Sequence, residues 1–190
     1  MSMPVGSIPQ ANYGVVVVSE TALSPKENIG PDWTLAFNQV MDQKAKTLEK
    51  EVEVKAEAID AYFRVRNMPL EGMGLKMVQE AEKNGLDWRL LPAISVVEST
   101  GGKNACKNAA HSFMGWGSCK INFNSDEEAI EIVAKNLGGN NPNTDQHYAD
   151  KTTKEILQKY NPPSVAPNYA EKVMRVMNEI GENEMVIVNV

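Results

Sequence analysis

Glu98 is the residue of this sequence best placed to do chemistry. It follows an apolar run from Leu91 to Val97 and precedes the glycine pair Gly101 and Gly102. A carboxyl at the edge of apolar packing is partly desolvated, which raises its pKa and keeps part of it protonated near neutral pH. Such a group can give its proton to a leaving oxygen. The alternative is that Glu98 is the solvated end of a helix, where a negative charge is unfavourable by roughly a few tenths of a kcal/mol.

Two cysteines flank the loop that follows, Cys106 and Cys119. A disulfide that closes a loop of this size stabilises a fold by about 3 kcal/mol, and it is the interpretation we favour. The alternatives are two free thiols, or a nucleophilic cysteine paired with His111 or His147. Neither cysteine stands at a helix start or in a basic cluster that would lower its pKa. The sequence has no CxxC or CxxH spacing, so we expect no metal site, and nothing in it calls for a cofactor.

Aromatic residues accompany the acid. Trp116 stands between Gly115 and Gly117, a context in which the backbone can approach a ligand closely. An exposed Trp or Tyr near an acid suits stacking on a sugar ring; the alternative is that Trp116 anchors its loop in the core. Three tyrosines stand near the ends of expected helices, where a side chain can face a cleft: Tyr148, Tyr160 and Tyr169.

The elements that must position these residues are mostly helices, so we expect a mainly α fold with at most a small β-hairpin. The hairpin would lie at Ser118–Phe123. The helix over 88–99 is apolar nearly all round and should be the central buried one. Ser125 and Glu128 form a capping-box pattern that predicts a helix start. The other expected helices run over 33–66, from residue 69 or 70 to 83, within 151–162 and from about 167 to a stop at Gly181.

These elements suggest four parts of the chain. Residues 1–32 form a poorly ordered lead-in, 33–66 a long amphipathic helix, 67–181 the functional domain and 182–190 a C-terminal tail. The long helix carries a narrow apolar stripe that two lysines interrupt, which suits either a coiled-coil stalk for self-association or a helix lying on the domain. If the chain is a helical interaction protein whose residues 33–66 do the main work by coiled-coil pairing, Leu48→Asp or Ile59→Asp should dissociate a dimer. If the domain 67–181 does the main work, a purified domain 67–190 should be active on its own.

Composition limits the partners and the compartment. The net charge is −6 and no Lys/Arg cluster exists, so we expect no nucleic-acid partner. No apolar run approaches the length of a transmembrane helix. The N-terminal apolar run, 13–23, has no positively charged segment before it and is too short for the apolar core of an export signal, so no export signal is visible. A disulfide nevertheless implies an oxidising compartment, so we expect an extracytoplasmic location, in the cell envelope or secreted.

Four pieces of the chain, in order, resemble the lysozyme-like peptidoglycan enzymes. The first is Glu98-Ser99 with Gly102-Lys103, and the second is Gly115-Trp116. The third is "FNSDEEAI" and the fourth "APNYAEKVMRVM", which contains Tyr169. The chain is similar above all to bacterial autolysin-type N-acetylglucosaminidases, that is, to domains like mannosyl-glycoprotein endo-β-N-acetylglucosaminidase, and next to lytic transglycosylases. Two positions depart from the pattern, since Ser112 and Met114 stand where the family has Asn and Phe.

The resemblance implies a lysozyme-like fold and cleavage of β-1,4-glycosidic bonds in peptidoglycan. Glu98 would be the general acid and Tyr169 the active-site tyrosine. The substrate-binding residues would be Ser99, Met114, Trp116 and Tyr148.

The glucosaminidases often carry a second acid on a hairpin after the Gly-Trp step. Here no carboxylate precedes Asp126, which with Glu127 resembles helix-capping residues. Lytic transglycosylases also use one Glu, with the substrate's own N-acetyl group or 6-hydroxyl as nucleophile. A hydrolase, a transglycosylase and a non-catalytic glycan-binding or structural module of the same fold are thus the alternatives.

Overall fold

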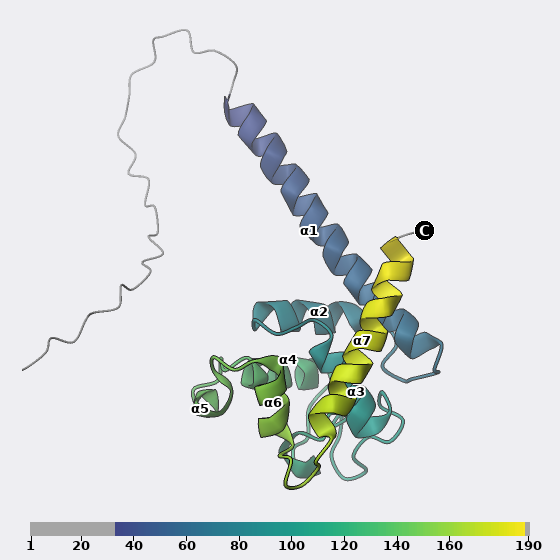
Figure 1. Cartoon of the computed structure of the whole chain (residues 1–190). Coiled ribbons are helices and arrows are strands. Elements are labelled where there is room, and N and C mark those ends of the chain that lie inside the picture. The colour runs from purple at the N-terminus through teal and green to yellow at the C-terminus, as the bar shows by residue number, and fades with distance from the viewer. Residues whose placement is uncertain (1–32, 189–190) are drawn as a thin grey trace, which may run out of the picture.

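The computed structural model describes residues 33–188, which form a helical domain with one long helix projecting from it (Figure 1). This range holds seven α-helices, one 3-10 helix and no strand, which confirms the mainly α expectation. No helix in it is long and apolar enough to cross a bilayer. The elements are α1 (Trp33–Arg64), α2 (Gly74–Lys83), α3 (Leu90–Ser99), η1 (Trp116–Cys119), α4 (Asp126–Leu137), α5 (Asp145–Tyr148), α6 (Thr153–Tyr160) and α7 (Tyr169–Val188).

Two local expectations are wrong. The 3-10 helix η1 occupies the start of the segment 118–123, where we expected an extended pair, because Ser118 and Cys119 both adopt positive φ. Gly181 does not end the last helix, which continues to Val188 through most of the expected tail. A Cβ at Gly181 would lie 3.1 Å from a guanidinium nitrogen of Arg89, so this glycine lets α7 pass close to Arg89. The lead-in at 1–32 lies outside the described residues.

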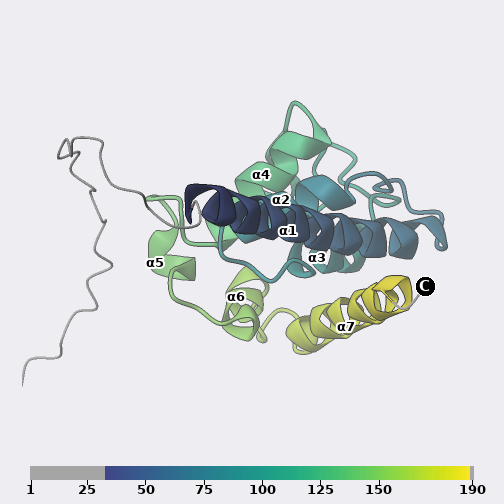
Figure 2. The same ribbon diagram turned by 90° about the horizontal axis from the view of Figure 1, so that it is seen from above.

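Helix α3 lies at the centre of the core, as its apolar sequence predicts. Leu90, Leu91 and Ile94 are fully buried, and α3 packs against α2 and α7. In the view of Figure 2, α3 is seen between α1 and α7. The core continues into α4 through Ile130 and Val133. On α7, Val173 and Met177 face the core, whereas Met174 is 39% exposed. The site-bearing end of α3 is therefore held by packing from several elements.

The second half of α1 belongs to this core. Ile59 and Phe63 are fully buried and Tyr62 nearly so, and α1 packs against both α2 and α7. The second half of α1 and the residues after 67 thus share one hydrophobic core across the expected boundary between residues 66 and 67. A fragment 67–190 would lack these side chains and leave their partners exposed to water, so we no longer expect it to fold and act alone.

Asp60 of α1 fixes the start of α2, a contact that no local pattern indicates. Its Oδ1 accepts hydrogen bonds from the backbone N–H groups of Gly72 at 2.9 Å and Gly74 at 3.0 Å. Burial raises the pKa of the Asp60 carboxyl, and the two N–H groups oppose that rise. A Cβ at Gly74 would lie 2.3 Å from the carbonyl oxygen of Ala56, so only glycine allows α2 to start so close to α1.

We predict that Asp60→Ala destabilises the fold by about 1–3 kcal/mol, because it leaves two backbone donors without their acceptor. Urea unfolding followed by circular dichroism measures the change. The control is Asp42→Ala on the exposed half of α1, which should change stability by no more than about 0.5 kcal/mol. Equal effects of the two substitutions would contradict this role of Asp60.

Candidate active site at Glu98

A sharp turn at the end of α3 places Glu98 at the rim of the core. Thr100, Gly101 and Gly102 have consecutive positive φ values, so the chain leaves the helix axis immediately. Ser99 holds this turn: its Oγ donates to the carbonyl oxygen of Ser95 at 3.0 Å and accepts from the N–H of Gly102 at 2.9 Å. Ser99 is 3% exposed. Its hydroxyl thus serves the backbone here, and the structure does not present it to a ligand.

Glu98 is half-buried, and its carboxyl meets the hydroxyl of Tyr169 from the start of α7. Tyr169 Oη donates to Glu98 Oε1 at 2.6 Å. Burial raises the pKa of Glu98 above its ordinary value, and the hydrogen bond from Tyr169 offsets part of that rise. Burial and the adjacent carboxyl also raise the pKa of Tyr169, so the phenol stays a neutral donor. The structure therefore joins the two residues proposed for catalysis, although 71 positions separate them.

The backbone of Gly115 lies close to the other oxygen of the carboxyl, Oε2. A Cβ at this position would lie 2.7 Å from Glu98 Oε2, inside van der Waals contact. Its φ of +68° is also a value that residues with a side chain rarely adopt. The glycine beside Trp116 was expected to let the backbone approach a ligand. In the structure it lets the backbone approach Glu98.

The loop that carries Gly115 is tied by a disulfide. The sulfurs of Cys106 and Cys119 are 2.00 Å apart, and their Cα atoms 5.6 Å, which confirms the expected pairing. Within 100–125 the sole regular element is η1. The loop thus has little secondary structure to hold it, and the disulfide restrains its ends around Gly115 and Trp116.

Four aromatic rings form a continuous row beside the acid. Tyr169 stacks on Tyr160 with ring centroids 5.9 Å apart and planes 13° apart. Tyr160 contacts Trp116 at 5.8 Å, and Trp116 contacts Tyr148 at 6.2 Å. The hydroxyl of Tyr160 donates to the carbonyl oxygen of Met114. From the sequence we expected that the three tyrosines can face a cleft, and we assigned Tyr148, Tyr169 and Trp116 to the site but not Tyr160.

Two hollows lie along this row. One, of about 310 Å³, is lined by Val97, Glu98, Asn161, Ala166, Pro167, Asn168, Tyr169 and Lys172. The other, of about 300 Å³, is lined by Gly115, Trp116, Gly117, Ser118, Tyr148 and Tyr160. The stacked tyrosines connect them, since Tyr169 lines the first and Tyr160 the second. The polar lining residues Asn161, Asn168 and Lys172 were not singled out from the sequence. The one signal that could have indicated them is that Asn168 directly precedes Tyr169.

Other expected site residues lie elsewhere. The Met114 side chain is 2% exposed and belongs to the core, so its thioether does not line the site. Met114 contacts the row of rings only through its backbone carbonyl, which accepts the hydrogen bond from Tyr160. Ser112 is buried, and its Oγ has no hydrogen-bond partner. The alternative of a nucleophilic cysteine paired with a histidine is wrong, because both cysteines are in the disulfide. His111 Nδ1 lies 2.8 Å from Asp126 Oδ1. Asp126 begins α4, as its helix-start pattern predicts.

Comparison with protein-family models, with curated proteins and with solved structures finds no match.

We predict that Gly115→Ala disturbs the Glu98 carboxyl beyond the strain of its own backbone. Gly85 offers a matched control, because it has the same φ of +68° and no atom within 4 Å of a Cβ built on it. Each substitution should destabilise the fold by about 1–2 kcal/mol through the left-handed backbone conformation. Gly115→Ala should lose additional stability and alter the NMR titration of Glu98, whereas Gly85→Ala should not. Identical stability and titration in the two variants would refute the contact.

Proposed function

We propose that this domain cleaves β-1,4-glycosidic bonds in the glycan strands of peptidoglycan, with Glu98 as the general acid. The observation that carries the proposal is the environment of Glu98. Its carboxyl is half-buried, has a raised pKa, and lines a hollow of about 310 Å³ that sugar-sized groups can enter. A carboxyl with a raised pKa keeps a protonated fraction near neutral pH and can protonate the glycosidic oxygen.

The row of aromatic rings supports a sugar as the ligand. Trp116 and Tyr148 line the second hollow, and a half-buried indole offers an apolar face to the C–H groups of a sugar ring. Asn161 and Asn168, in the first hollow, carry amides that suit hydroxyl and N-acetyl groups. These features agree with the resemblance of the sequence to lysozyme-like enzymes, which remains the reason for choosing peptidoglycan among N-acetylated glycans.

The lone carboxylate favours a transglycosylase as the second candidate. Among the described residues that line the two hollows, Glu98 is the one acid. Schemes with two positioned carboxylates need a second acid on the other side of the scissile bond. With one acid, Glu98 donates its proton to the leaving oxygen as the bond from C1 breaks. The 6-hydroxyl of the same sugar then attacks C1 and returns its proton to Glu98, which gives an anhydro-sugar.

Tyr169 would position Glu98 and limit its pKa. Its hydroxyl donates to Oε1, so the opposite oxygen, Oε2, is the one left to carry or deliver the proton. The carboxylate formed after proton transfer is stabilised by the same hydrogen bond. Tyr160 stacks on the ring of Tyr169 and so holds the hydroxyl in place.

We predict that Glu98→Gln lowers the cleavage of purified peptidoglycan by about 10²–10⁴-fold, the usual contribution of a general acid. Mass spectrometry of soluble products measures it. Glu182→Gln, on an exposed position of α7, is the matched control and should act like the wild type. Reducing-end products that depend on Glu98 identify a hydrolase, and anhydro-sugar products a transglycosylase. Intact binding with no product from the wild type would leave the non-catalytic glycan-binding module.

A second prediction concerns pH. Tyr169→Phe removes the hydrogen bond that lowers the pKa of Glu98, so the pKa should rise further. Because Glu98 must be protonated to act, the basic limb of the kcat/KM profile should move to higher pH, with the maximal rate lowered by about tenfold or more through lost positioning. Tyr160→Phe, which loses a bond to Met114 but none to Glu98, should leave that limb in place. A shift to lower pH in Tyr169→Phe would overturn the assignment.

A further inference from the structure

The projecting half of α1 exposes an unusual concentration of large apolar side chains. Residues 33–51 of α1 are all exposed. Half of the large hydrophobic residues that the described chain exposes fall within residues 33–48: Trp33, Leu35, Phe37, Val40, Met41 and Leu48, at 48–75% exposure. Large contiguous apolar surfaces on a soluble domain mark sites of interaction.

Most of these side chains continue the face by which α1 packs on its own domain. Met41, Leu48, Val52 and Ile59 follow one another at spacings of seven, four and seven, which places them on one face of the helix. Ile59 is fully buried by the domain and Val52 packs against the core, whereas Met41 and Leu48 are exposed. The apolar stripe is thus covered at one end only. We call the positions Phe37, Met41, Lys44, Leu48 and Val52 of this face the free stripe; Val52, its last position, is half-buried where the domain begins.

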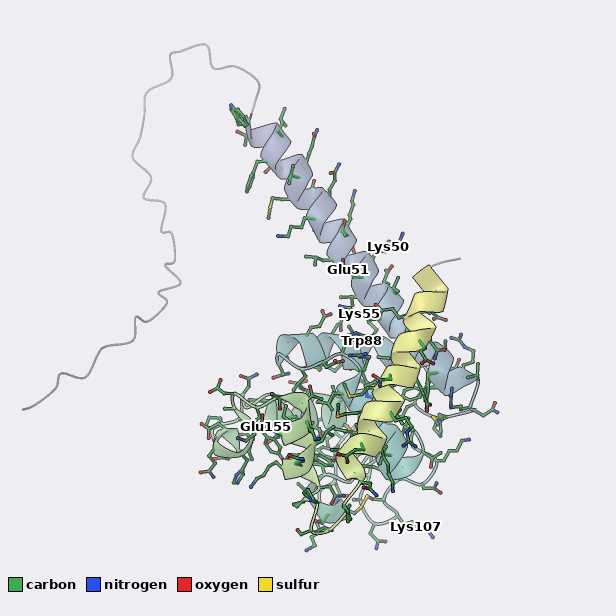
Figure 3. The ribbon with its side chains drawn as sticks, viewed as in Figure 1. Lys50, Glu51, Lys55, Trp88, Lys107 and Glu155 are labelled. Atoms are coloured by element: carbon green, nitrogen blue, oxygen red, sulfur yellow. A yellow bond between two sulfur atoms is a disulfide. The ribbon has the colours of Figure 1, made fainter. Side chains whose placement is uncertain are left out.

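The charged side chains of the projecting half lie mainly away from this stripe. Asp42, Lys46 and Lys50 recur at four-residue spacing on the opposite face, and Glu53 and Glu57 continue that face. Figure 3 shows the side chains of this half extending from the helix, with Lys50 and Glu51 labelled above the domain and Lys55 nearer to it. Lys55 forms an ion pair with Glu82 of α2 at 2.6 Å. The junction is therefore tied to the domain, and the helix beyond it has one apolar and one charged side.

The free stripe is complementary to itself when two copies run antiparallel. If residues 44 and 45 of two copies face each other, every apolar position of the stripe meets an apolar position of the other copy. Phe37 of one copy faces Val52 of the other, and Met41 of one copy faces Leu48 of the other. The two-fold symmetry of the pair repeats both contacts with the copies exchanged. Lys44 stands beside Ala45 at the centre, where its long side chain can reach water at the edge of the pair.

A parallel arrangement conflicts with the fold. Paired helices lie about 8–10 Å apart. The domain covers the stripe face of α1 from Ala56 onward, where α1 packs against α2 and α7. Figure 1 shows α7 crossing beside the lower part of α1. In a parallel pair both domains would occupy that face at the same height, between the helices. In the antiparallel register each domain lies at an opposite end, and Trp33 of one copy reaches the level of Ala56 in the other.

We propose that this chain forms an antiparallel dimer through the free stripe of α1. The paired segment, residues 37–52 of both copies, is 16 residues, or about 24 Å, long. The dimer carries its two domains at opposite ends of the helix pair. It does not depend on the proposed cleavage of peptidoglycan, and it would stand if Glu98 proved inactive.

Sedimentation equilibrium of the full chain tests the dimer. The wild type should be dimeric at micromolar concentration, and Leu48→Glu should raise the dimer dissociation constant at least about tenfold by placing a charge between the helices. Leu35→Glu is the matched control, because Leu35 is equally exposed but lies off the stripe. Ile59→Glu is unsuitable, since that buried residue would unfold the domain. Circular dichroism should show both Glu variants folded.

Cross-linking tests the register. The native cysteines are bonded to each other, so an added cysteine supplies a free thiol. Met41→Cys and Leu48→Cys, with an affinity tag on one of them, are mixed under mild oxidation. The proposal expects a mixed cross-linked dimer of the two variants and little self-linked Met41→Cys.

Three results would overturn the proposal. They are a monomeric wild type, equal dimers in Leu48→Glu and the wild type, and self-linked Met41→Cys as the main product, which indicates a parallel pair. If the wild type is monomeric and a chain of residues 33–190 is dimeric, the preceding segment of the same chain covers the stripe instead.

Discussion

The site depends on one constraint: the carboxyl of Glu98 must stay partly out of water and yet remain able to exchange a proton. Burial alone would raise the pKa of this carboxyl but would not fix the orientation of its two oxygens. The hydroxyl of Tyr169 fixes one oxygen at 2.6 Å and opposes part of the rise. The backbone of Gly115 approaches the other oxygen so closely that a methyl group would not fit. The carboxyl is thus oriented from two sides, which is what a general acid requires.

The remaining structure holds these three groups in place. Packing around α3 fixes the backbone of Glu98, and Ser99 fixes the turn that ends the helix. The disulfide restrains the loop that carries Gly115, and the stack of Tyr160 on Tyr169 restrains the phenol. The second half of α1 completes the core on which α2 and α7 pack. The packing of α1 on α2 and α7 and the contacts of Glu98 with Tyr169 and Gly115 join residues distant in sequence, so the site forms only when the domain has folded.

Local chemistry was the part of the fold that could be predicted. Ser125 accepts from the N–H of Glu128 at 3.2 Å, as its pattern predicts, although the Glu128 carboxylate accepts from the N–H of Asn124 and not of Ser125. The apolar run of α3 correctly indicated the central helix. Non-local contacts carried no such signal: Asp60 accepts from Gly72 and Gly74, and Gly181 lies inside α7, close to Arg89, where we expected the helix to end. At the site, Glu98 and Tyr169 came from the resemblance, while the approach of Gly115 to Glu98 depends on the fold.

The most direct test of the account is the pKa of Glu98 in the folded full chain. Carbon-13 NMR titration of the Glu carboxyls measures it, with the signal assigned by its loss in Glu98→Gln. Glu127 serves as an internal comparison, because its position at the start of α4 lowers its pKa. The account predicts that Glu98 titrates clearly above the ordinary value of about 4.3 and well above Glu127. A pKa for Glu98 at or below the ordinary value would contradict it, because the carboxyl would then hold no proton to donate near neutral pH.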